Sequence, residues 1–232
     1  MMESAADPET ARVMARYFQV RPGGYGEGDV FLGLKLSELR PLAAPYLREP
    51  FEPERWLPLL RSAVHEHRLI SLVVMSERAR RNVGRRGDPE ELELVHWTYL
   101  DNTAWVNNWD LVDISCKPVV GGYLQHRDRA PLYVLARSES LWERRIAMVG
   151  CQWFLKAGET DDLFRLAEML LGDRHDLMHK AVGWSLRESG KPDPSGLRQF
   201  LTSHVSEMPR TTLRYAIEHF DPEERRTYLD LR

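Results

Sequence analysis

Apolar residues recur at steps of three and four positions along nearly the whole chain, as in Leu163, Leu166 and Leu170. This spacing puts them on one face of a helix and predicts amphipathic helices. Residues 30–36 are the best candidate for a strand, but they do not alternate clearly between apolar and polar. We therefore expect an all-α fold. Glycine-containing breaks should separate the helices at residues 21–28, 84–87, 121–122, 158 and 190.

Three helix starts are marked by the same short motif, Asp-Pro-Glu, at residues 7–9, 88–90 and 221–223. Asp is a preferred N-cap residue, and Pro fits the first helical position because its missing N–H would have no partner there. The following acid opposes the positive end of the helix dipole. Each motif therefore predicts that a helix begins at its proline.

A repeat organises these helices. Arg145, Lys180 and Arg214 stand 35 and 34 residues apart, each in an apolar or basic stretch that follows an amphipathic segment. Steps of 35 and then 42 residues back from Arg145 reach Asp110 and Arg68. Helix pairs at this spacing are typical of an α-solenoid of the HEAT or armadillo kind. We expect one curved domain over residues 1–232, with roughly six helix pairs.

These five equivalent positions, which we call the ladder (Arg68, Asp110, Arg145, Lys180 and Arg214), should line the concave face, and four of the five are basic. A cation in the first turn of a helix opposes the helix dipole, so a bound polyanion would offset that cost. The plainer alternative is that these charges are merely solvated. The ladder therefore favours a phosphate-binding groove.

Composition narrows the class of protein. The 232 residues suit one domain or at most two, and the net charge of −3 argues against a histone-like polyanion binder but not against a local basic groove. Of the 32 basic residues five are Lys, which leaves 27 Arg; this suits phosphate binding, although G+C-rich coding gives the same bias. Cys116 and Cys151 lack metal-type spacing. No apolar run is long enough for a membrane span, and the acidic N-terminus is no signal peptide. We expect a cytoplasmic monomer with no membrane contact and no obligate protein partner.

The stretch from Asn107 to Asp113 contains the most distinctive chemistry. On a helix Trp109 and Asp113 are at i and i+4 and share a face, so an aromatic plane lies beside a carboxylate. Trp184 lies four residues beyond Lys180, one turn further along its helix. Aromatic faces alternating with cations suit nucleic acid. Alternatively, Trp109 is a core aromatic and Asp113 pairs with an arginine of the ladder.

The chain resembles the AlkD-type family of bacterial DNA alkylation repair proteins, which are HEAT-like-repeat DNA glycosylases. The matching pieces run in the family's order with similar spacing and cover most of the chain. They are Met14–Tyr17, Phe31–Gly33, Trp109–Asp113, Leu141–Ala147 and Lys180–Glu188.

The resemblance implies a set of roles. Asp113 is the catalytic carboxylate, Trp109 and Trp184 pack on the deoxyribose of the lesion, Arg145 holds the neighbouring phosphate, and Tyr17 is a further wall residue. Family members release cationic N3- or N7-alkylated purines from double-stranded DNA, and the best-studied do so without flipping the base. Further DNA contacts are expected from Arg144, Lys180, Arg187, Arg214 and Tyr25.

The residues agree with that chemistry. A cationic alkylpurine leaves as a neutral base and needs no general acid, metal or cofactor. A carboxylate and two aromatic faces can stabilise positive charge developing on the sugar. We expect a shallow groove without a deep pocket, and no Schiff base, because no lysine is expected at the site. The alternatives are a paralogue that binds damaged, bent or branched DNA without cutting it, and, least favoured, a protein-binding adaptor.

Two features depart from the family. The first is the Gly-rich loop at residues 21–29, which is either a flexible connector or a DNA-facing loop that presents Tyr25. It is no phosphate cradle, because it lacks a preceding strand and the P-loop lysine and carries Glu27 and Asp29. The second is Asn108, which stands where the family has a tryptophan before Trp109.

Overall fold

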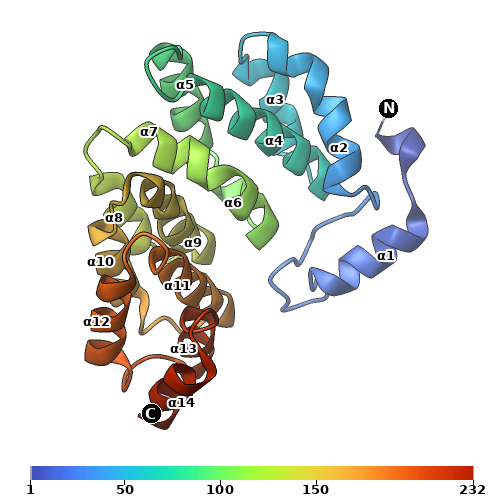
Figure 1. The fold of residues 1–232 in the computed structure, drawn as a ribbon. Coiled ribbons are helices and arrows are strands. Elements are labelled where there is room, and N and C mark those ends of the chain that lie inside the picture. The colour runs from blue at the N-terminus through green and yellow to red at the C-terminus, as the bar shows by residue number, and fades with distance from the viewer. Residues whose placement is uncertain (1, 232) are drawn as a thin grey trace. The chain divides into compact units, whose positions relative to one another are not determined.

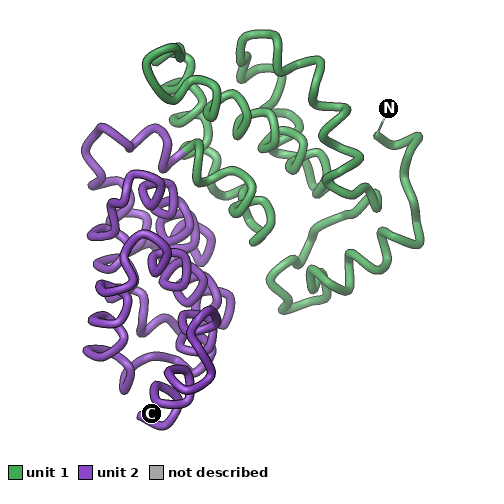
Figure 2. Tube along the Cα trace, viewed as in Figure 1, with its two compact units in different colours: residues 1–119 green, residues 120–232 purple. Residues whose placement is uncertain are grey.

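The computed structural model describes residues 2–231 and separates into two compact units, residues 1–119 and 120–232 (Figure 2). The helices of the first unit are α1 (Pro8–Tyr17), α2 (Leu36–Ala43), α3 (Pro53–Leu60), α4 (His65–Asn82), α5 (Pro89–Leu100) and α6 (Trp109–Cys116), with 3₁₀ turns at Glu3–Ala5, Ala44–Arg48 and Thr103–Trp105.

A π-helical stretch at Lys117–Gly121, where Pro118 removes one backbone donor, runs from the end of the first unit into the second. The helices of the second unit are α7 (Gly122–Leu124), α8 (Ala130–Ala136), α9 (Leu141–Gly150), α10 (Asp161–Leu170), α11 (Asp176–Ser189), α12 (Pro194–His204), α13 (Arg210–Ala216) and α14 (Pro222–Asp230), with a 3₁₀ helix at Cys151–Ala157 (Figure 1).

The fold is all-α, as the apolar periodicity predicts. Within residues 2–231 the single β-type pairing is an isolated bridge between Val30 and Val64, so the ambiguous stretch at 30–36 is not a strand. The three Asp-Pro-Glu motifs begin α1, α5 and α14 as expected. In each, the Asp side chain accepts a hydrogen bond from a backbone N–H of the first turn.

In the first unit α4 is the central helix and packs against α2, α3, α5 and α6 (Figure 1). A helix surrounded by partners must be apolar on most sides, and α4 is buried along most of its length. Leu72 and Met75 are both fully buried in its middle. Arg68, near its start, is also buried, with only 1% of its surface exposed.

In the second unit α9, α11 and α13 pack side by side in chain order. Gly183 permits the close approach of α11 to α13, because a Cβ there would lie 2.5 Å from the carbonyl oxygen of Thr212. Gly121 plays the same part beside Gly150, whose carbonyl oxygen would be 2.3 Å from an added Cβ. Cys116 and Cys151 are both buried, and no disulfide joins them.

The predicted repeat is real at the level of helices. The five ladder positions fall on five different helices, α4, α6, α9, α11 and α13 in turn, although Arg214 lies in the last turn of α13 rather than at its start. Within the units, α4 contacts α6, and α11 contacts both α9 and α13. The structure is therefore a helical repeat, as the 34- and 35-residue spacing predicts.

Helix α1 is attached through the segment that follows the Gly-rich loop. The carboxylate of Glu66, on α4, accepts hydrogen bonds from the backbone N–H groups of Leu32, Gly33 and Leu34 at 2.8–3.1 Å. The Leu32 carbonyl in turn accepts from the N–H of Asp7, the cap of α1. Gly33 has φ +89°, and a Cβ there would lie 2.2 Å from the Asp7 carbonyl oxygen, so only glycine fits this junction.

None of the helices among residues 2–231 combines the length and the apolar character needed to cross a bilayer.

Candidate active site

Trp109 and Asp113 line the same cavity, of about 480 Å³, in the first unit. Both side chains are half-buried and lie one turn apart on α6, as their spacing predicts. The cavity is also lined by apolar residues of α1, α4 and the start of α2. Its remaining lining residues are Met14, Phe18, Leu34, Lys35, Leu36, Arg40, His65, Glu66, Leu69, Asp110 and Ile114.

The N-terminus of α6 is set by Asn108. Its buried side-chain oxygen accepts a hydrogen bond of 2.8 Å from the N–H of Trp109, which fixes where the helix begins. The Gly-rich loop packs against this cap, because a Cβ on Gly26 would lie 2.2 Å from the Phe18 carbonyl oxygen and 3.5 Å from the Asn108 amide nitrogen. The small Asn108 side chain thus leaves room for the loop.

A stack of rings holds Trp109. Its indole is stacked on Phe18 at 5.4 Å between ring centroids, and Phe18 is stacked on Phe31 at 5.2 Å. Phe31 is in turn stacked on the imidazole of His65 at 4.5 Å. Tyr17 meets Trp109 edge to face at 6.0 Å and is 64% exposed, so it lies at the surface beside Trp109.

His65 is the charged end of that stack. Its Nδ1 lies 3.0 Å from a carboxylate oxygen of Asp29, at the end of the Gly-rich loop, and its Nε2 lies 2.8 Å from one of Asp110, in the first turn of α6. Burial of the imidazole alone would lower its pKa. The hydrogen bonds and charges of Asp110 and Asp29 together outweigh that effect and raise the pKa of His65 to about 9.

Asp29 has a second cationic partner in Arg68, whose Nη2 lies 2.6 Å from its other carboxylate oxygen. Burial raises the pKa of Asp29, but the hydrogen bond with His65 and the charge of Arg68 bring the net pKa below its usual value. The expected role of Arg68 in a phosphate groove is therefore wrong, because its guanidinium is buried and neutralises Asp29. Asp110, another ladder position, likewise has a partner within the protein, because its carboxylate pairs with His65.

The Gly-rich loop is tied down at several points. The Tyr25 hydroxyl donates to the Tyr17 carbonyl oxygen at 3.1 Å, and the Glu27 carboxylate accepts from the N–H of Gly23 at 2.8 Å. With Asp29 buried at its end, the loop is a packed element that supports α1 and α6. Tyr25 is half-buried, and its hydroxyl joins the loop to the last residue of α1.

One predicted detail of the site is wrong. The cavity between Met14 and Phe18 on one side and α6 on the other is open to solvent. A lysine is present in it, since Lys35, an exposed residue at the start of α2, lines the same cavity. The place of this lysine could not be read from local sequence, because residues 14–36 and 109–114 meet only through the fold.

The other predicted site residues belong to the second unit, and most of its cations have acidic partners. Arg144 lies 2.6 Å from Asp173, and Lys180 lies 2.7 Å from Asp176. Arg187 pairs with both Glu188 and Glu218.

Arg145 is only 5% exposed, and its Nη1 donates to the Leu177 carbonyl oxygen at 2.8 Å. Trp184 is half-buried on α11, and Arg214 is exposed on α13. Of the cations expected to contact DNA in this unit, Arg214 therefore offers the most accessible guanidinium.

The residues that sequence analysis missed are Phe18, His65 and Asp29. Phe18 and His65 both line the cavity, and Asp29 holds His65. Within residues 2–231 no group of three or more His, Cys, Asp or Glu side chains is arranged to hold a metal ion.

Comparisons with known proteins agree with the fold and identify the family of the chain. A family model described as DNA alkylation repair enzyme matches residues 1–220. A solved structure from Enterococcus faecalis, described as a predicted DNA alkylation repair enzyme, superposes with a TM-score of 0.70 at 19% identity. The match covers 94% of this chain and 97% of that one, and at this identity it shows the shared fold. No curated protein matches the chain.

Proposed function

Because the chain belongs to the family of DNA alkylation repair enzymes, we propose that it is a monofunctional DNA glycosylase. Its substrate would be duplex DNA that contains a cationic N3- or N7-alkylated purine, and it would hydrolyse the N-glycosidic bond of that purine. The observation that carries the proposal is the shared cavity of Asp113 and Trp109. An anion and an indole face one turn apart on α6 form a site for a sugar that becomes positive.

In this reaction the main contribution of the protein is electrostatic stabilisation of the positive charge that develops on the sugar. The C1′–N bond of an alkylpurine cation breaks to release a neutral base, and the bonding electrons leave with that base. Positive charge then develops on the deoxyribose, and the Asp113 carboxylate stabilises it and orients the attacking water. The apolar residues around Asp113, such as Met14 and Leu69, strengthen this interaction by lowering the local dielectric.

The remaining roles rest on the sequence resemblance. It assigns Trp184 the second aromatic face and Arg145 the phosphate next to the lesion. Arg144, Lys180, Arg187 and Arg214 would add contacts to the DNA backbone. Since the lesion supplies its own leaving-group activation, we propose that its charge and the duplex shape select the substrate without base flipping.

The test is release of 7-methylguanine or 3-methyladenine from alkylated duplex DNA. Asp113→Asn keeps the size of the side chain and removes its charge, so release should fall at least about 100-fold while DNA binding persists. Asp101→Asn, at an exposed carboxylate that ends α5, is the matched control and should retain wild-type release. Tight duplex binding by the wild type without any release would contradict the enzyme and favour a non-catalytic DNA-binding protein.

A further inference from the structure

The turn that ends α1 contains an unusual backbone conformation. Gln19 has φ +54° and is the one non-glycine residue with positive φ in the part of the chain that the structure describes. The N–H of Gln19 bonds to the Arg16 carbonyl oxygen, and the N–H of Val20 bonds to that of Ala15. This pair of bonds is the Schellman arrangement, in which the left-handed residue is usually glycine. A glutamine here is therefore disfavoured by its backbone.

The side chain of Gln19 does nothing for the fold that would explain its presence. It is exposed and makes no side-chain hydrogen bond within residues 2–231. Arg21, two residues later, is also exposed and has no acidic partner in that range. This sets Arg21 apart from Arg68, Arg144, Lys180 and Arg187, whose charges are matched by carboxylates.

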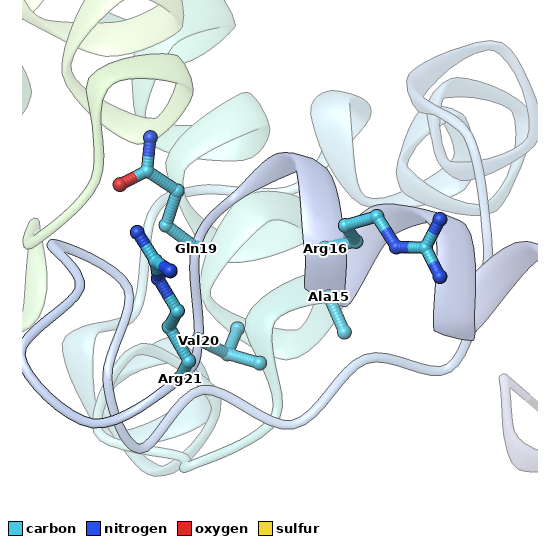
Figure 3. A pocket seen from close by; sticks show the side chains of 5 residues that line it. All are labelled: Ala15, Arg16, Gln19, Val20 and Arg21. Carbon is cyan, nitrogen blue, oxygen red and sulfur yellow. The ribbon is translucent and has the colours of Figure 1, made fainter.

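The side chains of Gln19 and Arg21 point to the same side of the turn, whereas that of Arg16 points the opposite way (Figure 3). Together with Ala15 and Val20 these residues line a surface cavity of about 400 Å³. The start of the Gly-rich loop is itself turned, because the N–H of Gly24 bonds to the Arg21 carbonyl oxygen. A Cβ on Gly24 would lie 1.8 Å from the Gln19 carbonyl oxygen, so the loop closes tightly against the turn.

The turn is next to the candidate active site in the same unit. It follows Tyr17 and Phe18 directly, and both rings contact Trp109. A primary amide can donate to and accept from base edges or sugar oxygens, and a free guanidinium binds a phosphate. An amide and a cation presented side by side thus match a nucleotide neighbouring the one that Asp113 acts on.

We propose that Gln19 and Arg21 form a DNA-reading turn that contacts duplex DNA beside the lesion, with Arg21 on a phosphate and the Gln19 amide on a base edge or sugar. The inference rests on the proposed function for its ligand, duplex DNA. A role in binding DNA explains why a glutamine stands at a position where glycine would be less strained. Strained backbone conformations of this kind cluster at functional sites.

The key variant is Gln19→Gly, measured by thermal unfolding and by fluorescence anisotropy with an undamaged 20-base-pair duplex over a range of salt. Glycine relieves the left-handed strain, so the unfolding midpoint should rise by about 1–3 °C, while DNA affinity falls about 3- to 10-fold. Arg21→Ala should weaken binding and reduce the slope of log K against log salt by about one.

Matched controls are Gln199→Ala on α12 and Arg226→Ala on α14, both exposed positions, and neither should change affinity. A rise in the unfolding midpoint of Gln19→Gly with unchanged affinity would overturn the proposal and leave a merely strained turn. A fall in that midpoint would assign the glutamine a structural role and would also overturn it. A different result would overturn the proposed function, namely a wild-type protein that binds duplex DNA but releases no base. A wild-type protein that does not bind duplex DNA would overturn both the proposed function and the DNA-reading turn.

Discussion

The imidazole Nε2 of His65 lies 2.8 Å from a carboxylate oxygen of Asp110, across 45 positions of sequence. This contact joins α4 to the first turn of α6, next to Trp109. Through its other nitrogen His65 also holds Asp29, so one buried cation connects the Gly-rich loop and both helices. The site thus depends on a charged group that the proposed chemistry does not use.

The pH dependence of stability follows from this arrangement. The pKa of His65 is raised from 6.5 to about 9, so its contribution is fully present below pH 6.5 and is lost as pH rises through about 9. That contribution is up to roughly 3 kcal/mol, from 1.36 kcal/mol per pKa unit. The pKa of Asp29 is lowered from 3.8, so its contribution is present above pH 3.8 and is lost in more acidic solution.

We therefore expect the free energy of unfolding, measured with urea, to fall between pH 6 and pH 10 in the wild type. His65→Gln should be less stable at pH 6, because it removes the cation that Asp110 and Asp29 share and leaves Asp29 with Arg68 alone, and it should show a flatter profile over this range. His126→Gln, at an exposed histidine, should keep the wild-type profile. Parallel wild-type and His65→Gln profiles would show that His65 is not charged in the folded protein.

The indole of Trp109 should contribute to catalysis more than to binding. Trp109→Ala removes the aromatic face that we propose lies on the sugar, and it should lower the release of alkylated base about 10- to 100-fold, with a much smaller change in duplex affinity. Trp97→Ala, at a tryptophan that is 47% exposed on α5, is the comparison and should retain activity. Equal losses of affinity and release in Trp109→Ala would place the indole in general DNA binding instead.

Arg145 is a test of the sequence resemblance, because its guanidinium is largely buried and already bonded to the Leu177 carbonyl oxygen. If it also reaches a phosphate, Arg145→Ala should weaken duplex binding and reduce the salt slope by about one. A lower unfolding midpoint with an unchanged slope would show that Arg145 only joins α9 to α11. Arg214→Ala, at an exposed cation, should reduce the slope without lowering the midpoint.

What the sequence predicted well is local or periodic. The caps at Asp7, Asp88 and Asp221 and the 34- to 35-residue repeat follow from short-range chemistry and helix spacing, and the structure confirms them. The shared cavity of Trp109 and Asp113 follows from their i, i+4 positions.

What the sequence could not predict is long-range pairing. Asp29 and His65 are 36 residues apart and have no periodic relation, so nothing local indicates that they meet. The prediction that Arg68 lines a phosphate groove was wrong for the same reason, because its partner is distant in the sequence. A cation at a helix start does oppose the dipole, but the compensating anion is a buried Asp29 from a distant loop and not a ligand.

The cavity beside Asp113 raises the question of whether a nucleotide is flipped out of the duplex into it. We expect the lesion to stay in the stack, since a cationic purine needs no protonation in a pocket. A duplex with 2-aminopurine next to a stable lesion analogue should then show little change in fluorescence on binding. A strong increase would indicate unstacking and would assign the cavity to a flipped nucleotide.

The monofunctional assignment depends on whether Lys35 forms a Schiff base with the abasic product. It lines the cavity with Asp113, and an amine there could attack C1′ of the abasic product, form a Schiff base and lead to strand cleavage by β-elimination. Lys35 is exposed, however, whereas lysines that form Schiff bases are activated in a desolvated pocket or beside another cation. We therefore expect intact strands with abasic sites after base release, and no covalent adduct when borohydride is added during turnover. A borohydride-trapped complex that disappears in Lys35→Gln but persists in Lys117→Gln would show a second, lyase step and would contradict the monofunctional assignment.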